Sequence, residues 1–208
     1  MSAGDDVTDF KVLSVLSRAL IHVVRGDLSV ITNDLTFMGT LTSPEEVERS
    51  KARCSHIGQF VGKLAILEGA FEMRSTTVEE LLRIDGDVRR DDPEGILSTR
   101  TLRCDLQRAR FMLTTLARLV DCRVVASSSG REQDAQDLVC TISFLRRRTT
   151  EVAGSYRYFS EFAAQAFGER SVVDAALCDL IVEGHGWRSG VVVSDTNVEL
   201  TVDIPLDS

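Results

Sequence analysis

Long apolar segments, paired cysteines and an excess of positive charge are all missing from this sequence of 208 residues. No apolar run approaches the roughly 18 residues that span a bilayer. The acidic opening MSAGDDVTDF does not resemble a secretory signal. These absences argue against a membrane protein, and we expect a cytoplasmic protein.

Metal-binding patterns and a basic surface are missing as well. The formal net charge of −8 argues against nucleic acid as a partner. The five cysteines include no C-x-x-C pair and none has a histidine at metal-ligand spacing. We expect them to be small buried apolar residues in a reducing compartment. They are Cys54, Cys104, Cys122, Cys140 and Cys178.

Two long helical patterns open the chain. The first runs from about Val7 to Met38, with its apolar residues within an arc of roughly 180°. The sequence Ser43-Pro44-Glu45-Glu46 then combines a capping residue, a first-turn proline and a glutamate at capping-box spacing, which predicts a helix start. We expect this second helix to reach about Met73. The two helices predict an antiparallel hairpin, and residues 1–77 are assigned to it.

The hairpin has two broad apolar faces that it cannot bury alone. A second copy of the chain would complete a four-helix bundle, so we expect a homodimer. Packing against the remainder of the same chain is the alternative.

The remainder, residues 78–208, is expected to form a second domain of mixed helices and strands. The charged stretch RIDGDVRRDDPEGI is interpreted as a linker or exposed loop. Helices are expected over 97–120, 156–167 and 172–183. Strands are expected at CRVVAS, LVCTISF, SGVVVSD and NVELTVDIPL. The expected fold class is α+β: a helical hairpin followed by a small sandwich of one sheet with helices on one face.

His22 lies on the polar side of the first helical pattern, beside Arg18, Arg25, Ser29 and Asn33. A solvent-exposed imidazole at this place could be reactive or simply an inert surface residue, and its position alone does not separate the two.

The order of these elements resembles the core of bacterial sensor histidine kinases. In that family the phosphoacceptor motif runs His, acidic, x, Arg, Thr or Asn, Pro, Leu, with an aliphatic residue three positions further on. The stretch HVVRGDLSVI matches it at His22, Arg25, Leu28 and Ile31. It departs from the motif at Val23, Gly26 and Asp27.

The C-terminal half extends the resemblance. The stretch DLIVEGHGWRSGVVVSDTNVELTVDIPL is similar to the last helix and closing hairpin of the kinases' ATP-binding domain, and DLQRARFMLTTLARLV is similar to its first helix. Within these stretches we interpret His185 as structural and Trp187 as packed against the sheet. His56, on the second helix, is interpreted as a surface residue.

The elements that bind nucleotide in that family are missing. Thr115 and Leu119 stand where the resemblance places two asparagines. Neither LRRRTTE nor FGERSVVDAA supplies the family's glycine-rich phosphate loops, whose backbone must approach the phosphates closely. The resemblance therefore implies a kinase-like domain without ATP or another cofactor.

A helical hairpin with a histidine on its surface, joined to a kinase-like domain without nucleotide-binding elements, is similar to the dimeric histidine phosphotransferases of phosphorelays. The resemblance implies that His22 takes a phosphoryl group from a response-regulator receiver domain, which supplies Mg²⁺, and passes it to another receiver. Arg25 would stabilise the phosphoryl oxygens. The docking face would comprise Arg18, Gly26, Ser29 and Asn33, with Asp27 as a further candidate contact. The alternative is an inert, pseudokinase-like dimeric module that docks a receiver or a hybrid histidine kinase.

Overall fold

A computed structural model of the chain describes residues 23–34, 43–83, 88–91, 96–120, 123–129, 138–147, 153–167 and 169–207. His22 and Arg18, two of the predicted site residues, lie outside the described residues. Cys122 lies outside them as well.

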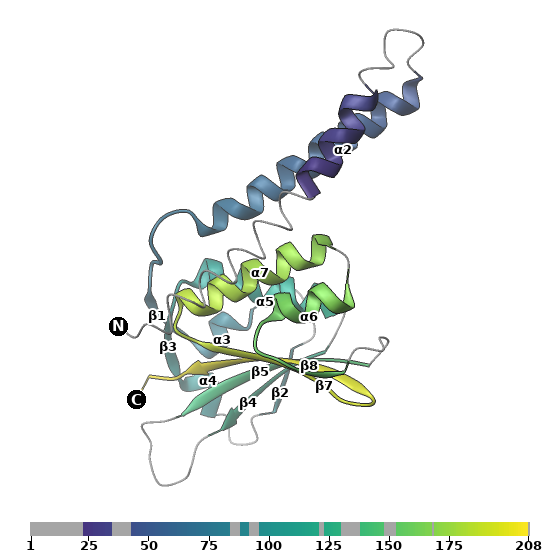
Figure 1. Cartoon of the computed structure of the whole chain (residues 1–208). Coiled ribbons are helices and arrows are strands. Elements are labelled where there is room, and N and C mark those ends of the chain that lie inside the picture. Colours follow the sequence, from purple (N-terminus) through teal and green to yellow (C-terminus); the bar gives the residue numbers. More distant parts are fainter. Residues whose placement is uncertain are drawn as a thin grey trace, which may run out of the picture.

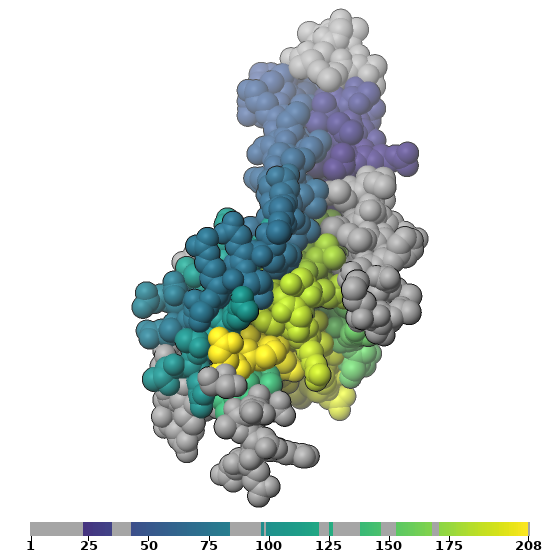
Figure 2. All heavy atoms as spheres, turned by 90° about the vertical axis from the view of Figure 1, so that its left-hand side faces the viewer, coloured from purple at the N-terminus to yellow at the C-terminus, as the bar shows by residue number. Residues whose placement is uncertain are grey.

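The N-terminal part is a helical hairpin, as the sequence predicted. A helix over 23–34 lies beside α2 (Pro44–Leu64), and the pair extends away from the rest of the molecule (Figures 1 and 2). The predicted capping box starts α2: the Ser43 hydroxyl accepts from the Glu46 amide at 3.3 Å, and the Glu46 carboxylate accepts from the Ser43 amide at 3.1 Å. These bonds satisfy backbone amides that the first helical turn leaves without partners.

The second helix ends earlier than the sequence predicted. After α2 comes one 3₁₀ turn, η1 (Ala65–Leu67), and the backbone then becomes extended at Glu68. Gly69 follows with φ +78°, a left-handed conformation that glycine adopts without strain. The expected continuation to Met73 is therefore wrong. The apolar spacing that suggested it arises because Leu67 packs on the core of the second domain and Phe71 on Arg108 and His185.

The second part is an α/β sandwich built on a sheet of six strands in the order β2-β4-β5-β8-β7-β6. Among the strands that the structure describes, β2 runs parallel to its neighbour β4, and the other pairings in this sheet are antiparallel. A separate two-stranded sheet pairs β1 with β3 in antiparallel register. The strands are β1 (Arg74–Thr77), β2 (Val88–Asp91), β3 (Thr101–Cys104), β4 (Arg123–Ser129), β5 (Val139–Arg147), β6 (Gly154–Tyr156), β7 (Arg188–Val193) and β8 (Asn197–Pro205).

Three helices, α5 (Leu106–Val120), α6 (Phe159–Ala166) and α7 (Glu169–Gly184), cover one face of the six-stranded sheet (Figure 1). The sheet side of this core follows the alternation of β8, in which Val198, Leu200, Val202 and Ile204 are buried and the residues between them are not. Two short helices, α3 (Val78–Leu81) and α4 (Ile96–Thr99), complete the domain. The predicted fold class is thus confirmed.

Three boundaries differ from the sequence predictions. The expected helix over 97–120 is interrupted, because Leu102 is fully buried in β3 and α5 starts only after Asp105. The segment interpreted as a linker contains β2, a strand of the main sheet. The expected helix over 156–167 begins at Phe159, since Tyr156 belongs to β6.

Candidate functional site

One face of the helix over 23–34 carries the predicted docking residues that the structure describes. Arg25, Gly26, Ser29 and Asn33 are all exposed. The Ser29 hydroxyl donates to the Arg25 carbonyl at 2.8 Å, a bond within the helix that does not bury either residue. Helical spacings of three and four residues place these positions on one face. The structure therefore brings them together on a surface that a partner can reach.

The side of the same helix that faces α2 is held by two ion pairs. The Asp27 carboxylate accepts from the Arg53 guanidinium at 2.8 Å, and the Asp27 side chain is only 3 % exposed. The Asp34 carboxylate accepts from Arg49 at 2.8 Å and from the Ser50 hydroxyl at 2.8 Å. These hydrogen bonds, with Arg49 contributing most, lower the pKa of Asp34 below its ordinary value.

Asp27, considered from the sequence as a further candidate contact, is buried, and its carboxylate faces α2 instead of the docking face. The two ion pairs instead fix how the helix is rotated against α2. That rotation determines which residues face the solvent, and so it sets the orientation of the docking face.

Parts of the hairpin's apolar surface are not covered within the described chain. Leu28 is 50 % exposed and Val61 is 61 % exposed. Cys54, expected to be buried, is also exposed, whereas Cys104, Cys140 and Cys178 are buried as predicted. Val61 lies seven residues after Cys54 on α2, so both side chains are on one side of that helix.

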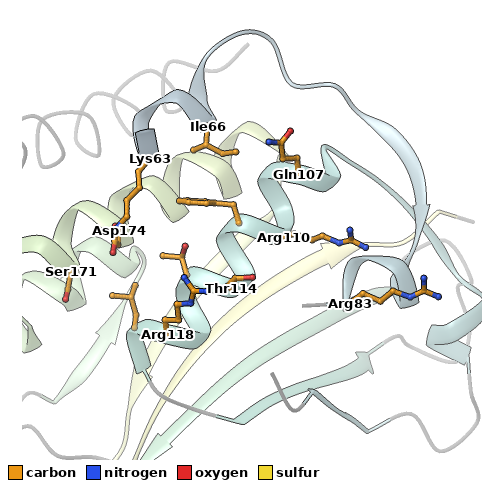
Figure 3. A pocket seen from close by; sticks show the side chains of 12 residues that line it. Lys63, Ile66, Arg83, Gln107, Arg110, Thr114, Arg118, Ser171 and Asp174 are labelled. Carbon is orange, nitrogen blue, oxygen red and sulfur yellow. The ribbon is translucent and has the colours of Figure 1, made fainter. Parts of the chain in front are cut away.

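The second candidate site is a groove between α5, the start of α7 and the end of α2, with a volume of about 630 Å³ (Figure 3). Thr115 and Leu119, the two positions where the family resemblance places asparagines, both line it. The Lys63 ammonium and the Asp174 carboxylate point toward one another across the groove and form an ion pair at 2.6 Å (Figure 3). The full lining is Lys63, Ile66, Arg83, Gln107, Arg110, Phe111, Thr114, Thr115, Arg118, Leu119, Ser171 and Asp174.

Sequence reasoning missed the charged lining of this groove. Arg110, Thr114 and Arg118 recur at intervals of four on α5 and form a polar stripe along one side of the helix. That interval was visible in the sequence. Its meaning was not, because the groove also needs Lys63 from α2 and Asp174 from α7.

His185 is held as a structural residue, in agreement with its interpretation from the sequence. Its Nε2 accepts from the Asp105 amide at 3.0 Å and its Nδ1 lies 2.7 Å from the Ile181 carbonyl. The ring stacks on buried Trp187 at 4.3 Å between centroids. Burial is the main cause that lowers the pKa of His185 below its ordinary value, so the ring is neutral at pH 7.

Metal sites and membrane spans were searched within the described ranges. No group of three or more histidine, cysteine, aspartate or glutamate side chains there is arranged to hold a metal ion. None of the helices described is long and apolar enough to cross a membrane.

Neither a protein-family model nor a curated protein matches the sequence. Solved structures do match. The histidine kinase AdeS of Acinetobacter baumannii is 13 % identical with a TM-score of 0.54, over 90 % of this chain and 98 % of that one. Full-length ShkA in complex with AMPPNP is 13 % identical with a TM-score of 0.50, over 93 % of this chain and 46 % of that one. A bacterial phosphotransferase is 12 % identical with a TM-score of 0.44, over 97 % of both chains.

At these identities the likeness establishes the fold and nothing finer. The likeness to AdeS covers 90 % of this chain, so it takes in residues of the hairpin as well as the α/β sandwich. The chain therefore has the fold of a histidine kinase core.

Proposed function

We propose that this chain is a cytoplasmic histidine phosphotransferase that moves a phosphoryl group between the aspartates of receiver domains through His22, without using ATP. The observation that supports it most is the exposed polar face of the helix over 23–34, fixed by the Asp27–Arg53 pair in a fold of the histidine kinase type. Arg25, Gly26, Ser29 and Asn33 follow position 22 by three, four, seven and eleven residues, which are helical spacings.

The proposed reaction needs little from this chain beyond a nucleophile and a docking face. A neutral imidazole nitrogen of His22 attacks the phosphorus of the aspartyl phosphate. The new N–P bond forms as the P–O bond to the aspartate breaks, and the electron pair leaves on the carboxylate. The receiver supplies Mg²⁺. Arg25, whose side chain is exposed, is proposed to stabilise the equatorial phosphoryl oxygens, with Arg18 as a second candidate.

The absence of ATP from the proposed mechanism is supported by the groove on α5. Thr115 and Leu119 line it, and neither provides the amide that the family's asparagines offer to metal and phosphate.

We further propose that the chain is a homodimer through its hairpin. The exposed Leu28 and Val61 support a four-helix bundle, because a second hairpin would remove them from water. Val61→Glu is expected to lower the mass measured by light scattering from dimer to monomer. Val192→Glu is the matched control, since Val192 is 51 % exposed but lies on β7 in the sheet domain. A monomeric wild type would contradict the proposal.

Phosphotransfer is tested by mixing the chain with ³²P-labelled receiver domains and measuring acid-labile label on it. We expect label on the wild type and at least 100-fold less on His22→Ala. His56→Ala is the matched control, because His56 is the hairpin's other histidine, on α2. Equal labelling of the wild type and His22→Ala would refute the role of His22.

A binding module without transfer is the second candidate, and the residues beside His22 favour it. Val23 has no ionisable group, so it cannot act as the acid–base partner that the resemblance would place there; its side chain is 8 % exposed and packs in the hairpin. Gly26 offers no side chain to orient water. This candidate predicts that receivers, or a hybrid histidine kinase, bind with equal affinity to the wild type and to His22→Ala, and that no receiver labels either protein.

A further inference from the structure

The hairpin buries an acidic side chain next to an apolar one that it leaves in water. The Asp27 side chain is only 3 % exposed, whereas Leu28, the next residue, is 50 % exposed. Hydrophobic burial alone would favour the opposite arrangement, because burying a leucine gains free energy and burying a carboxylate costs it. Apolar packing therefore does not account for the rotation of the helix over 23–34 at this turn.

The Arg53 guanidinium on α2 does account for it. Its Nη1 donates to Oδ1 of Asp27 at 2.8 Å, which is a charge-assisted hydrogen bond between the two helices. A carboxylate buried without a cation is strongly unfavourable, so the side of the helix that carries Asp27 must face Arg53.

A second ion pair lies on the same side of the helix. Asp34 follows Asp27 by seven residues, or about 10 Å along the axis, and its carboxylate accepts from Arg49 at 2.8 Å. The Arg49 side chain is 53 % exposed against 34 % for Arg53, so water screens this pair more. We therefore expect the pair at Asp27 to constrain the rotation most.

Asp27 stands at the position where the phosphoacceptor motif of the resemblance has a proline. A proline side chain has no charge and could not pair with Arg53. The departure from the motif at Asp27 is thus matched by a partner on α2, and the contact belongs to this chain and not to the motif.

The orientation of the docking face follows from this contact. Arg25, Gly26, Ser29 and Asn33 are exposed on the same helix that Asp27 fixes against α2. A shift by one residue would turn the helix by about 100°, which would bring Asp27 toward water and move all four residues round the axis.

We propose that Asp27 and Arg53 are positioning residues, whose ion pair holds the helix over 23–34 at the rotation in which its docking face meets a receiver domain. This inference rests on the proposed function, because it concerns the same face. Neither residue takes part in a bond-making step. Their contribution is orientation, to which the rate of a group transfer is very sensitive.

Transfer from ³²P-labelled receiver domains to the full chain tests the proposal, at a temperature at which circular dichroism shows every variant to be folded. We expect Arg53→Met to lower the second-order rate constant at least about tenfold. Arg53→Lys should stay within about threefold of the wild type, because the bond to Asp27 comes from one N–H that an ammonium can replace. Lys51→Met is the matched control: it also removes an ion pair on α2, with Glu48, but both side chains are well exposed. It should not change the rate constant.

A double variant separates stability from position. Asp27→Asn, Arg53→Met buries no unpaired charge, so it should be more stable than Arg53→Met. It also has no ion pair to fix the rotation, so its rate constant should remain at least about fivefold below that of the wild type. Recovery of both stability and rate constant would overturn the inference, because the pair would then matter for stability alone.

A second readout involves no phosphate. Ser29 is exposed and Val30 is partly buried, so the alkylation rates of Ser29→Cys and Val30→Cys, measured on the labelled peptides by mass spectrometry, report which side of the helix faces water. The ratio of these rates should change at least about threefold when Arg53→Met is added, because the two positions lie about 100° apart. Addition of Arg53→Lys should leave it unchanged.

The two readouts distinguish this inference from the proposed phosphotransfer. An unchanged alkylation ratio in Arg53→Met overturns the inference, even where the wild type accepts label from receivers. A changed ratio with no label on the wild type would refute phosphotransfer and support the hold of the Asp27–Arg53 pair on the docking face.

Discussion

Replacing Arg108 by methionine would remove the side chain that holds the segment between α2 and β1 on the sheet domain. The Arg108 guanidinium donates to the carbonyls of Ile66 at 2.7 Å, Glu68 at 2.6 Å and Gly69 at 3.2 Å. It also lies 4.2 Å from the centroid of the Phe71 ring. Residues 66–71, which follow α2, are thus held in place by contacts with the buried Arg108 guanidinium.

The expected loss of stability follows from these contacts. Arg108 is 5 % exposed, and each hydrogen bond from a charged donor contributes about 1.5 kcal/mol or more. Methionine retains much of the apolar contact with Phe71 but none of the three donated bonds. Removal of the cation also leaves Asp105, 3.6 Å away, without its nearby positive charge. We expect Arg108→Met to lower the free energy of unfolding by about 3 to 5 kcal/mol.

Urea denaturation followed by circular dichroism measures the loss. Hydrogen exchange locates the loss. The increase in exchange rate over the wild type should be larger for the amides of residues 66–72 than for those of β5 and β8. Arg108→Lys should fall between the wild type and Arg108→Met, because an ammonium keeps the charge but not the forked geometry. Arg103→Met, on the exposed side of β3, should cost under about 0.5 kcal/mol. A loss below about 1 kcal/mol for Arg108→Met would refute this reasoning.

Three further predictions concern Asp179, Arg53 and Gly184. Burial raises the pKa of Asp179 to about 7, so between pH 4 and 7 the folded chain keeps a proton that the unfolded chain has released. The free energy of unfolding should therefore fall by up to about 4 kcal/mol as the pH rises through that window, and Asp179→Asn should flatten this dependence in urea titrations; an unchanged slope would contradict it. Arg53→Met should cost about 2 kcal/mol in urea denaturation by leaving Asp27 buried without its cation, and an Asp27→Asn, Arg53→Met double variant should recover part of that loss; a double variant no more stable than Arg53→Met would show that the unpaired Asp27 charge is not its cause. Gly184→Ala should lower the midpoint of thermal unfolding, because the added Cβ would overlap the Phe71 ring; Gly186→Ala, with open space but φ +70°, tests backbone strain alone.

Local signals were sufficient for much of the fold. The capping box at Ser43 and Glu46 is formed as its spacing predicted, since both hydrogen bonds depend only on residues three positions apart. The strict alternation of β8 likewise determined which side chains face the core. The order of hairpin, helices and strands also carried the resemblance to histidine kinases, and the structure has that fold.

Where the sequence predictions failed, a distant residue decided the outcome. Leu102 fits both the apolar spacing of the predicted helix and the alternation of a strand. The pairing of β3 with β1 decides that it lies in a strand. Asp27 was interpreted as an exposed polar residue because its partner Arg53 lies 26 residues away on another helix.

The sequence alone therefore determined the capping box of α2, the buried positions of β8 and the exposed positions of Arg25, Gly26, Ser29 and Asn33, because each depends on residue identity or on spacing within one element. Tertiary structure decided the rotation of the hairpin helices, the early end of α2 at Leu64 and the groove lined by Lys63, Arg110, Arg118 and Asp174. These features come from contacts between elements far apart in the chain, and no local pattern records which element will cover which face.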